Sequence, residues 1–97
     1  MIEHIVLLKF SEQSTDEQKN EAVKRCREMK GNVPGLVNIE AGINFSERSQ
    51  GFSIGMTILF ENEEALKEFA IDQYHEEVKT YLKEIGHKDT LVVDFAI

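Results

Sequence analysis

Apolar and polar residues alternate in four segments of the chain, and a period of two is typical of β-strands that bury one face. The pattern predicts strands at residues 2–10 and 36–45, a third strand that ends at Phe60, and a last strand at residues 91–97. In each strand one alternating set is the more apolar, and we expect these sets to meet the helices. They are Val6, Leu8 and Phe10, then Val37, Ile39 and Ala41, then Ile54, Met56 and Ile58, and finally Leu91, Val93 and Phe95.

A first helix is predicted after the polar stretch that follows the first strand. The motifs S-x-x-E and T-x-x-Q at residues 14–18 each offer a capping box. Gly31 and the Pro-Gly pair at residues 34–35 should stop the helix. Its apolar stripe, at helical spacing, is Ala22, Val23, Cys26 and Met29.

A second helical stretch is broken in two. Asn62 is placed to cap a short helix and Asp72 to cap a longer one, which Gly86 ends. The apolar residues of these two helices are Ala65, Leu66, Phe69 and Ala70 in the short one, and Tyr74, Val78, Tyr81, Leu82 and Ile85 in the longer one.

The predicted order is therefore strand, helix, strand, strand, broken helix, strand. This order is the split βαβ pattern of ferredoxin-like folds. We expect an α+β fold with a four-stranded antiparallel sheet, helices on one of its faces, and a single domain over residues 1–97.

The other face of the sheet is also rich in apolar residues. It is expected to carry Ile5, Leu7, Leu36, Leu59, Val92 and Ala96, mixed with Asn38, Glu40, Thr57 and Asp94. Such a patch is large for a small monomer. Packing against an identical sheet about a two-fold axis would cover it, so we expect a homodimer through this face.

The charge and the cysteine count of the chain argue against several classes of function. The chain carries 11 basic and 18 acidic residues, a formal net charge of -7, which argues against nucleic-acid binding and against anionic membrane surfaces. The single cysteine, Cys26, excludes an intrachain disulfide, and no His/Asp/Glu cluster has metal-ligand spacing. No cofactor motif is present. The amino-terminal apolar run lacks a basic region and a cleavage site, so we expect a cytoplasmic protein.

Several segments together resemble the stress-responsive A/B barrel (Dabb) family of the dimeric α/β barrel superfamily. They are HIVLLKF, K-G-x-V-P-G-L, I-E-A-G-x-N, G-F-S, ALKEFAIDQYHEEV and L-V-V-D-F, which span nearly the whole chain. The resemblance implies a ferredoxin-like protomer, a homodimer whose sheets pack into a barrel, and a cleft between helices and sheet. It implies no single chemistry, because the family includes stress-induced plant proteins, bacterial proteins of unknown role and plant polyketide cyclases.

The cyclase branch of that family uses a histidine and a tyrosine in the cleft, without metal or organic cofactor. The resemblance places the histidine at His75 and the tyrosine at Phe69, so the phenol is missing here. A second cleft histidine of that branch falls at Ile54. The proline of its H-P-x-H segment is also absent. The histidine therefore carries over, and its polar helpers do not.

Two hypotheses about function follow, with a third from analogy. The first is a dimeric stress-response barrel that binds a small apolar or aromatic molecule in its cleft. The second is a cofactor-free cyclase-like or isomerase-like enzyme with His75 as general base. The third, a flavin-free monooxygenase of the wider superfamily, rests on the fold alone. Besides His75, the residues expected to line the cleft are His4, Val6, Leu8, Met56, Phe69, Val78 and Leu82.

Structural roles compete with functional ones at several positions. His75 near a helix start is either a neutral base or a polar residue bonded to the backbone. His4 is either a ligand contact or a core-edge residue bonded to a neighbour. His87 follows Gly86, which is predicted to lie in a turn, and is expected to be solvated. Tyr81 and Cys26 are expected to be core residues.

Overall fold

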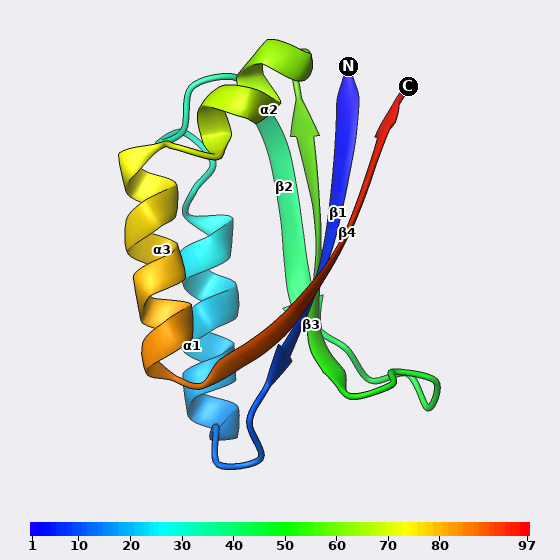
Figure 1. Ribbon diagram of the computed structural model, residues 1–97, viewed down its shortest axis with the longest axis vertical. Helices are drawn as coiled ribbons and strands as arrows, with labels where there is room; N and C mark the ends of the chain where they lie inside the picture. Colours follow the sequence, from blue (N-terminus) through cyan, green and yellow to red (C-terminus); the bar gives the residue numbers. More distant parts are fainter.

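The computed structural model describes residues 1–97, in which four strands and three helices follow the predicted order (Figure 1). The elements are β1 (Ile2–Phe10), α1 (Asp16–Arg27), β2 (Leu36–Ile43), β3 (Phe52–Phe60), α2 (Glu63–Phe69), α3 (Gln73–Glu84) and β4 (His87–Ala96).

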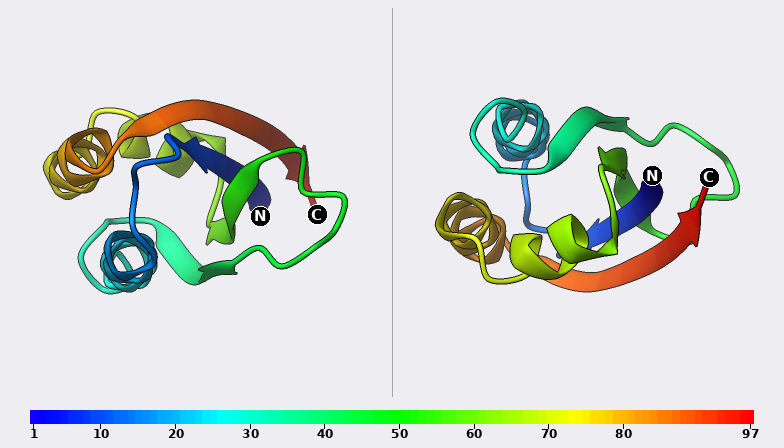
Figure 2. Two further views of the ribbon diagram at one scale, coloured as in Figure 1. Left: turned by 90° about the horizontal axis from the view of Figure 1, so that it is seen from below. Right: turned by 90° about the horizontal axis from the view of Figure 1, so that it is seen from above.

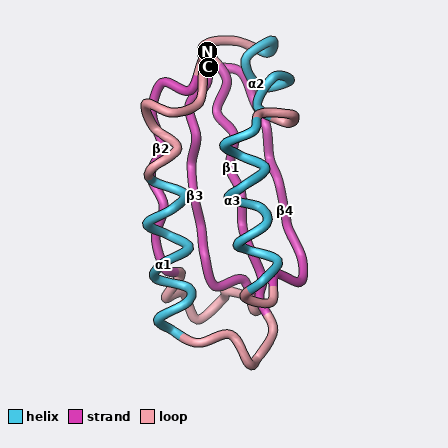
Figure 3. Tube along the Cα trace, turned by 90° about the vertical axis from the view of Figure 1, so that its left-hand side faces the viewer, coloured by secondary structure: helices cyan, strands magenta, loops and turns pink.

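The four strands form one antiparallel sheet in the order β2-β3-β1-β4. The helices lie on one face of this sheet, with α1 over β2 and β3 and α3 over β1 and β4 (Figures 2 and 3). This is the α+β ferredoxin-like fold that the sequence predicts. The first strand lies between β3 and the last strand, so its two edges are both paired.

The predicted caps start all three helices. Thr15 forms a capping box with Gln18 at the start of α1, while Asn62 and Asp72 accept backbone N–H groups at the starts of α2 and α3. Each such cap stabilises its helix by about 1 kcal/mol. The first helix ends at Arg27, ahead of the predicted stop at residue 31, and Met29 is buried in the turns that follow.

The core lies between the helices and the helix-facing side of the sheet. Strand faces from β1 and β3 supply eight of its 21 residues, as predicted, and α1 adds its apolar stripe. Its most completely buried large side chains are Phe60, Met29, Ile54, Ile58 and Cys26.

An irregularity at the start of β2 changes which side chains face the core. Leu36 pairs with Phe60, but Asn38 pairs with Leu59, so Val37 is an extra residue in the ladder. Leu36 is consequently buried and Val37 exposed, and the prediction that Leu36 lies on the opposite face is wrong. Strict alternation fails here because a bulge resets the parity of the strand.

The last strand also departs from the prediction. It begins at His87 rather than residue 91, and its register places Asp94 opposite His4 and Val92 opposite Val6. Directly paired residues share a face of the sheet. Val92, Asp94 and Ala96 therefore face the helix side, and their predicted place on the far face is wrong. The prediction that Leu91, Val93 and Phe95 meet the helices is wrong for the same reason, because they pair with Leu7, Ile5 and Glu3 on the other face. The alternation could not decide this, because both sides of the strand are largely apolar.

The side of the sheet away from the helices, here called the outer face, carries apolar residues mixed with polar ones, among them Glu3. It carries Ile5, Leu7, Leu59, Leu91, Val93 and Phe95, with Asn38, Glu40 and Thr57 among them. The three apolar residues of β4 are between 44% and 50% exposed in the single chain. None of the helices combines the length and hydropathy needed to cross a membrane.

Gly35 sets the approach of α2 to the sheet. Its φ of +79° lies in the left-handed region, and an added Cβ would lie 2.5 Å from Cβ of Ala65 on α2. Its carbonyl oxygen accepts the backbone N–H of Glu61, at 3.0 Å, just before that helix. Glycine therefore meets two demands at this position, one conformational and one steric.

Gly35→Ala should destabilise the protein by about 3 kcal/mol, because it adds overpacking against Ala65 to the strain of a left-handed alanine. Gly31 is a matched control, since its φ is +85° but no atom lies within 4 Å of its added Cβ. Gly31→Ala should cost only about 1 kcal/mol. Urea denaturation measures both, and equal losses would contradict the close approach of α2.

Candidate functional site

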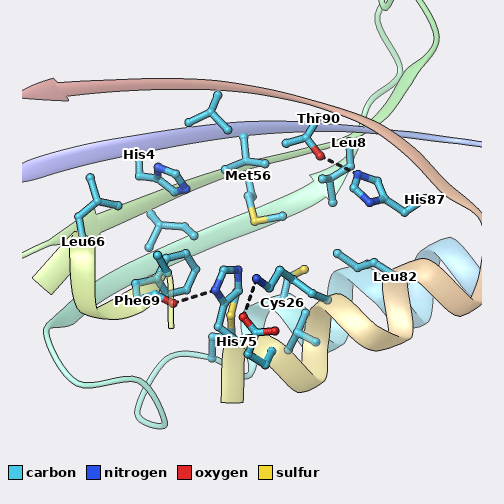
Figure 4. A pocket seen from close by; sticks show the side chains of 18 of the residues that line it. His4, Leu8, Cys26, Met56, Leu66, Phe69, His75, Leu82, His87 and Thr90 are labelled. Atoms are coloured by element: carbon cyan, nitrogen blue, oxygen red, sulfur yellow. Dashed lines mark hydrogen bonds and ion pairs between the residues drawn. The ribbon is translucent and has the colours of Figure 1, made fainter. Parts of the chain in front are cut away.

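One large cavity lies between the helix side of the sheet and helices α2 and α3. Its volume is about 760 Å³, and β1, β3 and β4 form its floor (Figure 4). The structure brings all eight sequence-predicted cleft residues to its wall. They are His4, Val6, Leu8, Met56, Phe69, His75, Val78 and Leu82.

His75 lies at the start of α3, where its backbone and its ring both make contacts. Its backbone N–H donates to the Asp72 side chain that caps the helix, at 3.0 Å. Its ring stacks on Phe69, with 3.7 Å between centroids and 16° between planes, and Nδ1 lies 2.8 Å from the Phe69 carbonyl oxygen. Because a carbonyl can only accept, Nδ1 carries the proton. In the neutral ring the lone pair is therefore on Nε2.

Burial lowers the pKa of His75 below its ordinary value of 6.5, because the imidazolium loses hydration in this half-buried position. The Lys79 ammonium lowers that pKa further. The Phe69 carbonyl, Glu76 and Asp72 act in the opposite direction without reversing the shift. At neutral pH the His75 ring is accordingly uncharged and able to accept a proton.

His4 is paired with Asp94 across the β1–β4 ladder. Its Nδ1 is hydrogen-bonded to the Asp94 carboxylate, which leaves Nε2 for other partners. The ring also packs edge-on against Phe60 and Phe69, each with 5.9 Å between centroids. Sequence reasoning missed this partner because it placed Asp94 on the outer face. Only the strand register, which no local pattern reports, could have revealed the pair.

His87 lines the far end of the same cavity, where it is partly exposed. Its Nε2 lies 2.6 Å from Thr90 Oγ1 and 3.2 Å from the Asp89 carbonyl oxygen. The carbonyl again requires the proton on that nitrogen. All three histidines of the chain therefore border one cavity, with His4 and His75 toward one end and His87 at the other (Figure 4).

Other chemistry-bearing groups are unsuited to catalysis here. Cys26 borders the cavity but is fully buried, and burial raises the pKa of its thiol to about 12, which keeps it protonated. No tyrosine lines the cavity, and the Tyr81 hydroxyl instead donates to the Gln18 carbonyl at 3.4 Å. No three His, Cys, Asp or Glu side chains come together as metal ligands.

Solved structures share this fold at low sequence identity. A protein of Arabidopsis thaliana matches with a TM-score of 0.86 and 21% identity, over 100% of this chain and 95% of its own. A dimeric protein of unknown function with a ferredoxin-like fold, from Bacteroides fragilis, matches with a TM-score of 0.81 and 22% identity, over 99% and 95%. A hydroxynitrile lyase from Passiflora edulis matches with a TM-score of 0.83 and 15% identity, over 99% and 92%.

These identities establish likeness of fold alone. Among curated proteins no match is found. The family comparison is decisive, because the model of the stress responsive A/B barrel domain matches residues 2–97, nearly the full length. The chain belongs to the stress responsive A/B barrel (Dabb) family.

Proposed function

We propose that this protein binds a small, largely apolar molecule in the cavity between its helices and its sheet. The observation that carries the proposal is the cavity itself, of about 760 Å³, in which 12 of the 22 lining residues are hydrophobic. Small-molecule sites are typically clefts of roughly 300 to 1,000 Å³ with apolar walls and a few polar groups. Three histidines supply such groups here.

Filling the cavity should abolish binding. Val92 lines it and is 45% exposed, so Val92→Trp places a large ring in open space. We expect this change to weaken binding of the neutral fluorophore N-phenyl-1-naphthylamine at least ten-fold in a fluorescence titration. Ile43 is equally exposed but lies outside the cavity, so Ile43→Trp should leave the affinity unchanged. Equal affinities for the two variants would contradict the proposal.

A second candidate is a cofactor-free enzyme of the cyclase or isomerase type. The observation that favours it is the orientation of His75, whose bond to the Phe69 carbonyl leaves Nε2 as a base in an apolar cavity. Nε2 would take a proton from a carbon or hydroxyl of the substrate. Nδ1–H would remain bonded to the carbonyl, which stabilises the imidazolium that forms. The paired His4 and Asp94 offer a second site of proton exchange.

If the protein is an enzyme, His75→Ala should lower turnover by roughly 10² to 10⁴-fold, the usual contribution of a positioned base. His4→Ala should have a smaller effect, mainly on binding. Phe69→Tyr restores a phenol at little cost in volume and should raise turnover of a polyketide-like substrate. Turnover of a panel of such substrates measures all three, and equal activity of His75→Ala and wild type would remove His75 from the mechanism.

The lowered pKa of His75 should be visible in solution. In a nuclear magnetic resonance titration its ring should titrate below 6.5. Lys79→Met should raise this pKa slightly, because it removes a nearby positive charge.

The unfolded chain binds a proton on His75 more readily than the folded chain does. This group's contribution to stability is therefore lost as pH falls from about 6.5 through the folded-state pKa. A ring that titrates at or above 6.5 would contradict the burial of His75.

We further propose that two copies of the chain pair through their outer faces. Support comes from the apolar outer face and from relatives of the same fold that are described as dimeric. Val93→Glu, in the middle of that face on β4, should convert the dimer to a monomer in sedimentation. Val92→Glu points to the other side of the same strand and should stay dimeric. A wild-type monomer at micromolar concentration would contradict the proposal.

A further inference from the structure

Some charged side chains on the cavity wall have a bonded partner of opposite charge or a hydrogen-bond partner, and others have none. Glu76 is bonded to Lys79 at 2.7 Å, and Asp94 is bonded to His4. Both carboxylates of the lining are thus occupied. Lys67 and Lys83 also line the cavity, and neither has a carboxylate within 4.0 Å. The charged side chains of the lining that have no bonded partner, Lys67 and Lys83, are therefore both positive, in a chain whose net charge is -7.

The two ends of the cavity differ in charge. Lys83 lies in the last turn of α3, which leads directly to His87 at the start of β4. His87 pairs with Phe10, whereas Asp94 pairs with His4, so the two ends are about 20 Å apart along β1. Both carboxylates of the lining belong to other parts of the wall. The end at Lys83 therefore has no carboxylate among its lining residues, and the nearby Asp89 carboxylate accepts the backbone N–H of Thr90 at 2.9 Å.

Thr90 gives this end a directed donor. Its Oγ1 accepts from Nε2–H of His87, at 2.6 Å, and Nε2–H is fixed as a donor by the Asp89 carbonyl. A hydroxyl that accepts one bond still has its own hydrogen to donate. Thr90 and Lys83 both line the cavity, so a ligand there has a hydroxyl donor and an ammonium on the same wall.

A structural explanation of Lys83 is available. A lysine in the last turn of a helix stabilises the helix dipole. Lys67 holds the same position in α2. That role predicts an effect of substitution on stability and no effect on which molecules bind, so the two roles are separable by experiment.

We infer that the ligand of the cavity is an amphipathic anion. Its carboxylate or similar group lies between Lys83 and Thr90, and its apolar body lies over Leu8, Val6 and Val92 toward His75. The inference rests on the proposed binding function and adds the class of ligand and its direction in the cavity. An anionic group bound by an ammonium and a hydroxyl is recognised through charge-assisted hydrogen bonds.

The test compares two fluorophores with the same aromatic body. N-phenyl-1-naphthylamine is neutral, and 8-anilinonaphthalene-1-sulfonate adds one anionic group. Lys83→Met keeps the apolar stem and removes the charge. We expect it to weaken binding of the sulfonate roughly three- to ten-fold, as for a partly exposed charge-assisted bond, and to change the affinity for the neutral probe less than two-fold. Lys83→Arg should retain most of the affinity for the sulfonate.

Two control variants, Lys88→Met and Lys67→Met, and one further test variant, Thr90→Val, locate the anion. Lys88 is exposed, adjacent to His87 and outside the cavity, so Lys88→Met should leave both affinities unchanged. Lys67→Met should also have less than a two-fold effect on the sulfonate. Thr90→Val should weaken the sulfonate alone. A loss with Lys67→Met equal to that with Lys83→Met would overturn the assigned direction.

The outcomes separate this inference from the binding function on which it rests. If Val92→Trp abolishes binding of the neutral probe but Lys83→Met leaves the sulfonate unaffected, the binding function stands and the anionic class is wrong. If Val92→Trp leaves the neutral probe bound, the cavity is not the binding site. If Lys83→Met lowers the melting temperature and weakens both probes equally, Lys83 has only the structural role.

Discussion

The pairing of β1 with β4 is the constraint on which the rest of the structure depends. It joins the two ends of the chain, and it gives β1 a partner on each edge. The same ladder places Asp94 beside His4 and Val92 beside Val6 on the cavity floor. A slip of one residue would turn every side chain of β4 to the opposite face, which would separate Asp94 from His4 and remove Leu91, Val93 and Phe95 from the outer face.

Phe69 connects the core to the candidate chemistry. Its ring packs against Phe60 and His4, and on its other side it stacks on His75. Its backbone carbonyl fixes the tautomer of that histidine. An aromatic residue that is needed for packing thus also orients a base. Since phenylalanine carries no hydroxyl, the base has no phenolic acid at this position.

The sheet has two apolar faces with different consequences. The inner face is covered by helices except where the cavity opens, and the polar groups there are paired or directed at that opening. The outer face carries six large apolar side chains among polar ones and has no cover within the chain. Hydrophobic burial alone does not distinguish the two faces, because both attract apolar partners. The connections between the elements distinguish the two faces, because they place all three helices on the same side of the sheet.

The sequence by itself determined the features that depend on near neighbours. The element order, the three helix caps and the inner faces of β1 and β3 follow from local periodicity and hydrogen bonding, and His75 could be placed near a helix start for the same reason. Tertiary structure alone decided the parity of β4, the bulge at Val37, the partner of His4 and the place of His87. These depend on hydrogen bonds between strands far apart in the chain, and a strand that is apolar on both sides carries no local signal of which side turns inward.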